Sequence, residues 1–104
     1  MLLTMTGGVC LSMSAQAAEI KQPNFSDPKA VHASMQTMVR EMSAMNDPFA
    51  QAQAQNCEQQ ASQFASYVQQ FVGAAVSYND VGGSETAKTF WGSCRDMYVG
   101  VKRR

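Results

Sequence analysis

The chain has 104 residues, with eight basic and eight acidic side chains and a formal net charge of zero. A neutral chain lacks the excess of basic charge that binds nucleic acid, so we do not expect nucleic acid as a partner. One histidine and three cysteines leave few side chains for nucleophilic catalysis or for zinc, which needs several Cys and His ligands at short spacing.

The N-terminal segment, MLLTMTGGVCLSMSAQAA, is apolar or small and carries no charge. It closes on an A-x-A sequence at residues 15–17, which is typical of a secretory signal-peptide cleavage site. We therefore expect a signal peptide over residues 1–17, cleaved near Ala17 and Ala18, and a periplasmic or secreted mature protein. The basic residues that usually begin a signal peptide are missing, so a start codon placed too late and a chain that is not exported are the alternatives. Glycines and serines interrupt the segment, and it is too short for a stable membrane span.

Residues 18–26 follow without a hydrophobic period and with a proline, so they are expected to form an extended arm ahead of a bundle over 27–104. Two Asp-Pro pairs then mark helix starts, at Asp27 and at Asp47. An Asp side chain accepts hydrogen bonds from the free backbone N–H groups at a helix N-terminus. Proline fits the first turn because no backbone donor is needed there. The first helix is predicted over 28–45, with one apolar stripe at intervals of four and three residues: Val31, Met35, Met38, Met42 and Met45.

The second helix is predicted over 48–73 or slightly longer, with a regular apolar stripe that continues from Ala50 to Tyr78. The third is predicted over 85–101, with Ser84 as its N-cap and an apolar stripe that includes Trp91. No β-branched run alternates with a period of two, so strands are not expected. The fold class is therefore all-α: a small three-helix antiparallel bundle, stapled by one disulfide and preceded by the signal peptide.

Cys57 and Cys94 remain after the signal peptide is removed, and both lie on apolar stripes. Two cysteines in a small exported domain are expected to form one disulfide. If the second helix ran unbroken into a tight turn, Cys94 would lie opposite residue 70, roughly 20 Å from Cys57 at about 1.5 Å per residue. A disulfide needs Cα atoms within about 7 Å. We therefore expect the second helix to end or bend near Gly73, with residues 74–84 as a connector that runs back along it. A disulfide between two copies and two buried free thiols are the alternatives.

Sequence motifs of catalysis are absent: there is no C-x-x-C, no G-x-S-x-G and no phosphate or calcium loop, and the acidic residues are scattered. His32 is the single histidine, so no second imidazole can assist it. We expect a protein that is not an enzyme.

The stretch VHASMQTMVREMSAM, residues 31–45, has three interpretations. Its methionines can be ordinary core residues, which fill gaps in helical bundles. They can form an adaptable groove for a partner, built from Met35, Met38, Met42 and Met45. They can also offer soft ligands to Cu(I), through His32 with Met35, Met38 and Met42. Burial against the helices that carry the cysteines would make the stripe core, and exposure would make it a binding site.

The second helix also has an unusual surface, because the segment from Pro48 to Tyr78 contains eight glutamines and a single charged residue, Glu58. Composition alone is one explanation. An uncharged amide surface is easier to desolvate than a charged one, which favours contact with another protein or with a second copy. We expect an exported helical accessory protein of the cell envelope, of the chaperone, secretion-adaptor or toxin-neutralising type, acting by protein–protein contact. A methionine-rich Cu(I) carrier is the alternative.

Overall fold

The computed structural model describes residues 20–103, so the predicted signal peptide at 1–17 lies outside the described residues. Within this range the chain forms three α-helices, α2 (Pro28–Ser43), α3 (Pro48–Gln69) and α4 (Gly83–Lys102), and a short 3-10 helix, η1 (Asn79–Val81). Residues 20–103 contain no strand, which confirms the all-helical prediction. None of the helices in this part of the chain combines the length and hydropathy that crossing a membrane requires.

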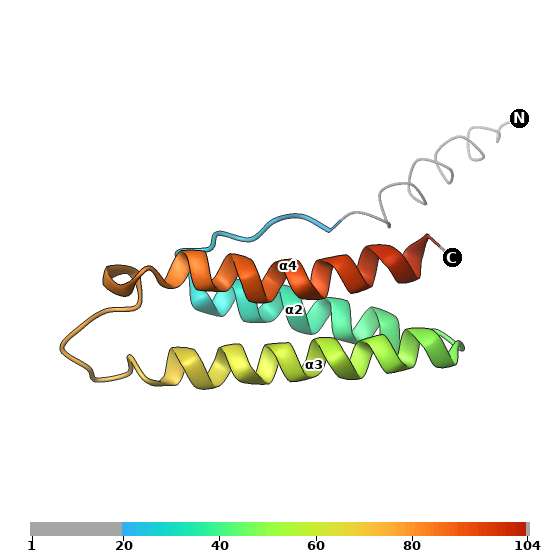
Figure 1. Ribbon diagram of the computed structural model, residues 1–104, viewed down its shortest axis with the longest axis horizontal. Helices are drawn as coiled ribbons and strands as arrows, with labels where there is room; N and C mark the ends of the chain where they lie inside the picture. Colours follow the sequence, from blue (N-terminus) through green and yellow to red (C-terminus); the bar gives the residue numbers. More distant parts are fainter. Residues whose placement is uncertain (1–19, 104) are drawn as a thin grey trace, which may run out of the picture.

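The three helices lie side by side, and each contacts the other two. A short turn joins α2 to α3, so these helices run antiparallel (Figure 1). A longer connector leads from α3 to α4, which runs back antiparallel to α3 and in the same direction as α2. The chain therefore forms an elongated up-down-up bundle.

Helices α2 and α3 each begin at the proline of an Asp-Pro pair. The Asp27 carboxylate accepts a hydrogen bond from the backbone N–H of Lys29 at 3.1 Å, and Asp47 accepts one from Phe49 at 3.0 Å. Helix α2 ends at Ser43, two residues before the predicted end. The reason is that Asp47 is extended, with φ −151°, as the residue before a proline prefers, so the preceding residues are used to reverse the chain.

Helix α3 ends at Gln69, four residues before Gly73, and the connector then loops around the end of the bundle (Figure 1). The expectation that this connector runs back along α3 is therefore wrong. Tyr78 explains the early end, because its ring packs against Phe64 and Phe71 with centroid distances of 6.4 Å in both cases. In a continuous helix Tyr78 would lie about 13 Å beyond Gln69, out of reach of these rings.

The start of α4 also differs from the prediction, because Gly82 and not Ser84 is the N-cap. Gly82 has a φ of 76°, a left-handed conformation that glycine adopts without steric cost. This conformation lets the Gly83 N–H donate to the Tyr78 carbonyl oxygen at 2.9 Å and turns the chain directly into the helix. Ser84 is thereby already inside the first turn of α4.

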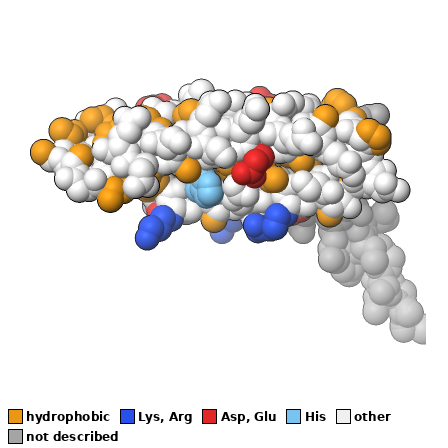
Figure 2. Space-filling model, turned by 90° about the horizontal axis from the view of Figure 1, so that it is seen from below, with side chains coloured by type: hydrophobic (Ala, Val, Ile, Leu, Met, Phe, Trp, Pro, Cys, Tyr) orange, Lys and Arg blue, Asp and Glu red, His pale blue; other side chains and the backbone are white. Residues whose placement is uncertain are grey.

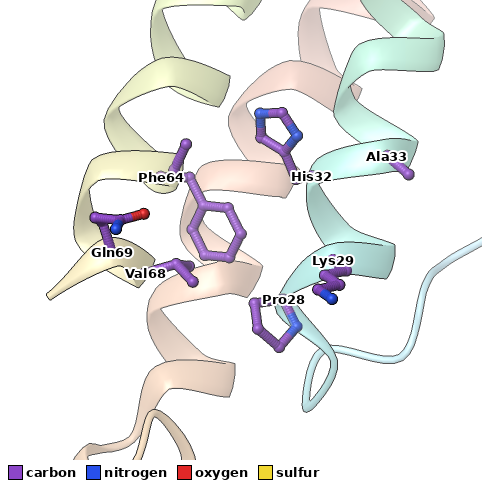
Figure 3. A pocket seen from close by; sticks show the side chains of 8 residues that line it. Pro28, Lys29, His32, Ala33, Phe64, Val68 and Gln69 are labelled. Atoms are coloured by element: carbon purple, nitrogen blue, oxygen red, sulfur yellow. The ribbon is translucent and has the colours of Figure 1, made fainter. Parts of the chain in front are cut away.

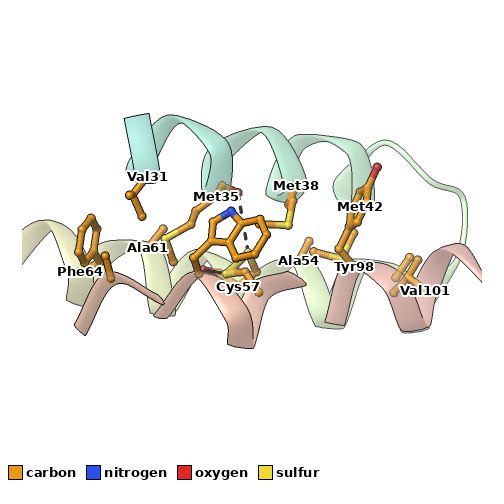
Figure 4. Packing of buried hydrophobic residues seen from close by; sticks show 14 of the residues in the cluster. Val31, Met35, Met38, Met42, Ala54, Cys57, Ala61, Phe64, Tyr98 and Val101 are labelled. Carbon is orange, nitrogen blue, oxygen red and sulfur yellow. Dashed lines mark hydrogen bonds between the residues drawn. A yellow bond between two sulfur atoms is a disulfide. The ribbon is translucent and has the colours of Figure 1, made fainter. Parts of the chain in front are cut away.

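The core lies along the axis between the three helices (Figure 4). Helix α3 contributes mainly small side chains, including Ala50, Ala54 and Ala61, whereas the methionines of α2 and the aromatic rings of α4 are large. Small residues on one helix leave room for large residues on its neighbours, so the three helices fill the interior at close approach. The buried set comprises Val31, Met35, Met38, Met42, Ala50, Ala54, Cys57, Ala61, Phe64, Tyr78, Ala87, Trp91, Cys94, Tyr98 and Val101.

Candidate functional site

The disulfide between Cys57 and Cys94 is present within the chain, with a Cα–Cα distance of 4.9 Å. Cys57 lies twelve residues before the end of α3, and Cys94 lies eleven residues after the start of α4. In an antiparallel pair these nearly equal distances from the connector place the two cysteines opposite each other. Both side chains are fully buried, so the bond belongs to the core.

The methionine stripe is part of the core. Met35, Met38 and Met42 have no exposed surface, and they point from α2 toward α3 and α4 (Figure 4). The prediction of an open partner groove is therefore wrong for these three residues, because the aromatic side chains of α4 complete the cover over them. Met45 follows α2 and is half-buried against the same core.

The alternative Cu(I) site is not assembled. His32 lines a surface pocket whose lining includes none of the three methionines (Figure 3). The thioether sulfur atoms lie in the core instead, without access for an incoming ion. Among residues 20–103 there is also no group of three or more His, Cys, Asp or Glu side chains that could hold a metal ion.

The pocket at His32 is an open recess of about 320 Å³ between the first turns of α2 and the last turns of α3 (Figure 3). Phe64 and Val68 supply apolar surface, while Lys29 and His32 supply the two basic groups. No carboxylate lines it, so the pocket does not pair an acid with a base. Its complete lining is Pro28, Lys29, His32, Ala33, Phe64, Ala65, Val68 and Gln69.

The outward side of α3 is mostly uncharged, because the helix contains a single charged residue, Glu58. Its other side chains are amides, hydroxyls and methyl groups, and Glu58 is exposed at one edge of it, three residues after Gln55. Figure 2 views the molecule from below, where α3 faces the viewer, and shows mainly uncharged surface with an acidic side chain near its middle and basic side chains along one edge. We call this surface the amide face; it consists of the exposed residues Ala52, Gln55, Asn56, Gln59, Gln63, Ser66 and Gln70.

Two tyrosine hydroxyls make hydrogen bonds that the sequence did not reveal. Tyr98 donates to a Glu41 carboxylate oxygen at 2.7 Å, and Tyr78 donates to the Phe25 carbonyl oxygen at 2.9 Å. Burial, followed by the hydrogen bond to Glu41, raises the pKa of Tyr98 well above its ordinary value. Burial is also the main cause of the raised pKa of Tyr78. Both hydroxyls therefore stay protonated at neutral pH and serve to fix the helix ends and the N-terminal arm.

The described surface thus offers an amphipathic recess at His32 and a long, mostly uncharged face on α3. The recess at His32 suits a ligand with a small apolar group. The amide face is as long as a helix and suits a macromolecular partner. No protein-family model matches this chain, and comparison with curated proteins and with solved structures likewise found no match.

Proposed function

We propose that the protein is an exported helical accessory protein of the cell envelope that acts by protein–protein contact through the amide face of α3. The observation that carries this proposal is that the exposed side of α3, about 27 Å long from Ala52 to Gln70, carries a single charged side chain, Glu58. The leader-like N-terminal sequence and the buried disulfide support an oxidising compartment outside the cytoplasm. A chaperone, a secretion adaptor or a toxin-neutralising protein would all use such a surface.

Desolvation favours this face over the other surfaces of the bundle. Removing a charged group from water costs far more than removing an amide, and an amide group offers both donors and acceptors to a partner. Against this, each glutamine that is fixed in an interface loses roughly 1.5–2 kcal/mol of side-chain entropy. The balance favours a reversible complex whose specificity comes from amide hydrogen bonds.

Site-specific photo-cross-linking in intact cells tests the proposal. A photoreactive residue at Gln59 should give a discrete cross-linked product, whereas the same residue at Thr89, which is exposed on α4, should not. Adding negative charge with Gln55→Glu and Gln63→Glu should abolish the product, while Thr89→Glu should leave it unchanged. The protein joined to this chain in the cross-linked product, either a second copy or another envelope protein, is the partner. Equal cross-linking at both positions, or indifference to the added charge, would refute the role of the amide face.

Export is tested separately by fractionation and by the mass of the mature protein. The proposal requires that the protein is recovered outside the cytoplasm with Ala18 as its first residue. Recovery of the full-length chain in the cytoplasm with reduced cysteines would contradict the location and leave the contact surface to be judged on its own experiment.

A further inference from the structure

A second recess, of about 520 Å³, lies between the N-terminal arm and α4. The arm contributes Gln22 and Phe25, and α4 contributes side chains spaced over two turns on one side of the helix. This recess is independent of the amide face, since none of its residues belongs to α3. Its lining consists of Gln22, Phe25, Lys88, Trp91, Gly92 and Arg95.

The aromatic part of this recess is held in place by contacts outside it. The rings of Phe25 and Trp91 meet edge to face with centroids 5.5 Å apart. The indole N–H of Trp91 donates to the Ser34 hydroxyl at 2.8 Å, and the Phe25 carbonyl oxygen accepts the Tyr78 hydroxyl at 2.9 Å. Trp91 is only 3% exposed, and because its indole N–H already has a partner, the small part of it that reaches the recess is apolar. The two rings therefore form a fixed apolar wall.

The charged part of the recess is entirely basic. Lys88 and Arg95 lie seven residues apart, about 10 Å along the helix, and no acidic residue lines the recess. Lys88 pairs with Glu85 at 3.2 Å and Arg95 pairs with Asp96 at 4.0 Å, both among exposed side chains. Exposed pairs of this kind are weak, so both cations remain able to bind an anion. Both charged groups that line the recess are therefore cations, each with an exposed carboxylate within 4.0 Å.

Gly92 lies between the two cations and keeps the floor of the recess open. An added Cβ at Gly92 would have no atom within 4 Å, and its φ is not positive, so neither packing nor backbone conformation requires glycine. Glycine inside a helix is destabilising relative to alanine. Gly100, also on α4, has equally open surroundings but lines neither recess, and it therefore serves as a matched control position.

We propose that this recess binds a small aromatic carboxylate. The ring lies against Trp91, Phe25 and the bare backbone of Gly92, and the carboxylate is held by Arg95 and Lys88. Arginine suits this role because its planar guanidinium matches a carboxylate with two parallel hydrogen bonds. A volume of about 520 Å³ lies within the range of small-molecule sites. The same chemistry is carried by a free aromatic acid and by a peptide that ends in an aromatic residue.

Calorimetry and fluorescence with defined probes test this proposal on the oxidised chain. Trp91 is the single tryptophan, so its emission reports on the recess directly. The probes are 3-phenylpropionate, its neutral amide, and the peptide Ala-Ala-Phe with a free or an amidated C-terminus. We expect saturable binding of at least one carboxylate probe, about tenfold or more tighter than its amide. The tighter of the two carboxylate probes identifies the source of the ligand.

Variants locate the binding. Gly92→Leu fills the recess and should abolish binding, whereas Gly100→Leu should not change it. Arg95→Gln should remove the preference for carboxylate over amide. If Gly92→Leu does not fold, Gly92→Ala and Arg95→Gln decide the question. Absence of saturable binding at 10 mM probe, equal binding of acid and amide, or binding that survives both Gly92→Leu and Arg95→Gln would overturn the proposal. A failure of the cross-linking experiment on the amide face would not contradict this binding site.

Discussion

Reduction of the Cys57–Cys94 disulfide should lower the stability of this bundle more than any single surface change. The bond closes a loop with a sequence separation of 37 residues. In the chain-entropy model, a loop of this length restricts the unfolded state enough to stabilise the fold by about 4 kcal/mol. A domain of this size has a total free energy of unfolding of roughly 5–15 kcal/mol, so the loss is a large fraction of it.

The expected shifts follow from this magnitude. For a chain of about this length the urea dependence is roughly 1 kcal/mol per M, so the midpoint of unfolding should fall by about 4 M. The melting temperature should fall by roughly 15–30 °C. Fluorescence of Trp91, which is 3% exposed in the fold, reports the transition. Because both sulfur atoms are buried, the bond must be reduced in denaturant before refolding in reductant.

The variant Cys57→Ala with Cys94→Ala provides the comparison, because it removes the bond without introducing thiols. Both the reduced protein and this variant should show the lower midpoint. A midpoint shift below 1 M urea would refute the reasoning. Non-reducing electrophoresis adds an independent check, since a dimer band that disappears with reductant would show that the bond joins two chains.

Three further outcomes are expected. Met38→Ala should lower the free energy of unfolding, measured by chemical denaturation, by about 2–5 kcal/mol because it leaves a cavity. Met38→Leu should lower it by less than about 1.5 kcal/mol. Gly83→Ala should lower the melting temperature, since its Cβ would lie 2.5 Å from the Tyr78 carbonyl oxygen, while Gly100→Ala should raise stability by roughly 0.5–1 kcal/mol. The contribution of Tyr78 and Tyr98 to stability should be constant up to about pH 10 and then fall, because the folded state raises the pKa of both hydroxyls and so binds more protons than the unfolded state. Unfolding titrations at pH 8 to 11 check this, and a fall that is equally steep in Tyr98→Phe would contradict the part assigned to Tyr98.

Local signals in the sequence were sufficient for the starts of α2 and α3 and for the pairing of the cysteines. An Asp-Pro pair acts within one turn of helix, so its effect does not depend on the rest of the fold. The end of α3 was harder to predict, because the residues after Gln69 continue the same apolar period. What ends the helix is the packing of Tyr78 onto Phe64, a contact between residues far apart in the chain.

The role of the methionines could not be settled by periodicity, since a core stripe and an open groove share the same spacing. The difference lies in whether a third helix covers the stripe, and Trp91 and Tyr98 provide that cover. The recess beneath the N-terminal arm was missed for a similar reason, because Phe25 and Trp91 meet only in the folded chain. Lys88, Gly92 and Arg95 did carry a usable signal, since spacings of three, four and seven residues place them on one side of a helix.

The disulfide joins α3 to α4 and leaves α2 held by packing, hydrogen bonds and the ion pair between Glu41 and Lys102. The oxidised chain can therefore open by releasing α2 while the α3–α4 hairpin stays covalently closed. Such an opening exposes four buried side chains of α2, each worth roughly 1.5–3 kcal/mol, so its free energy is of the same order as that of global unfolding and the open form is rare. Methionine oxidation by dilute peroxide would measure it, because Met35, Met38 and Met42 become reactive only in the open form. The oxidation rate of the α2 methionines would thus report how often the bundle opens.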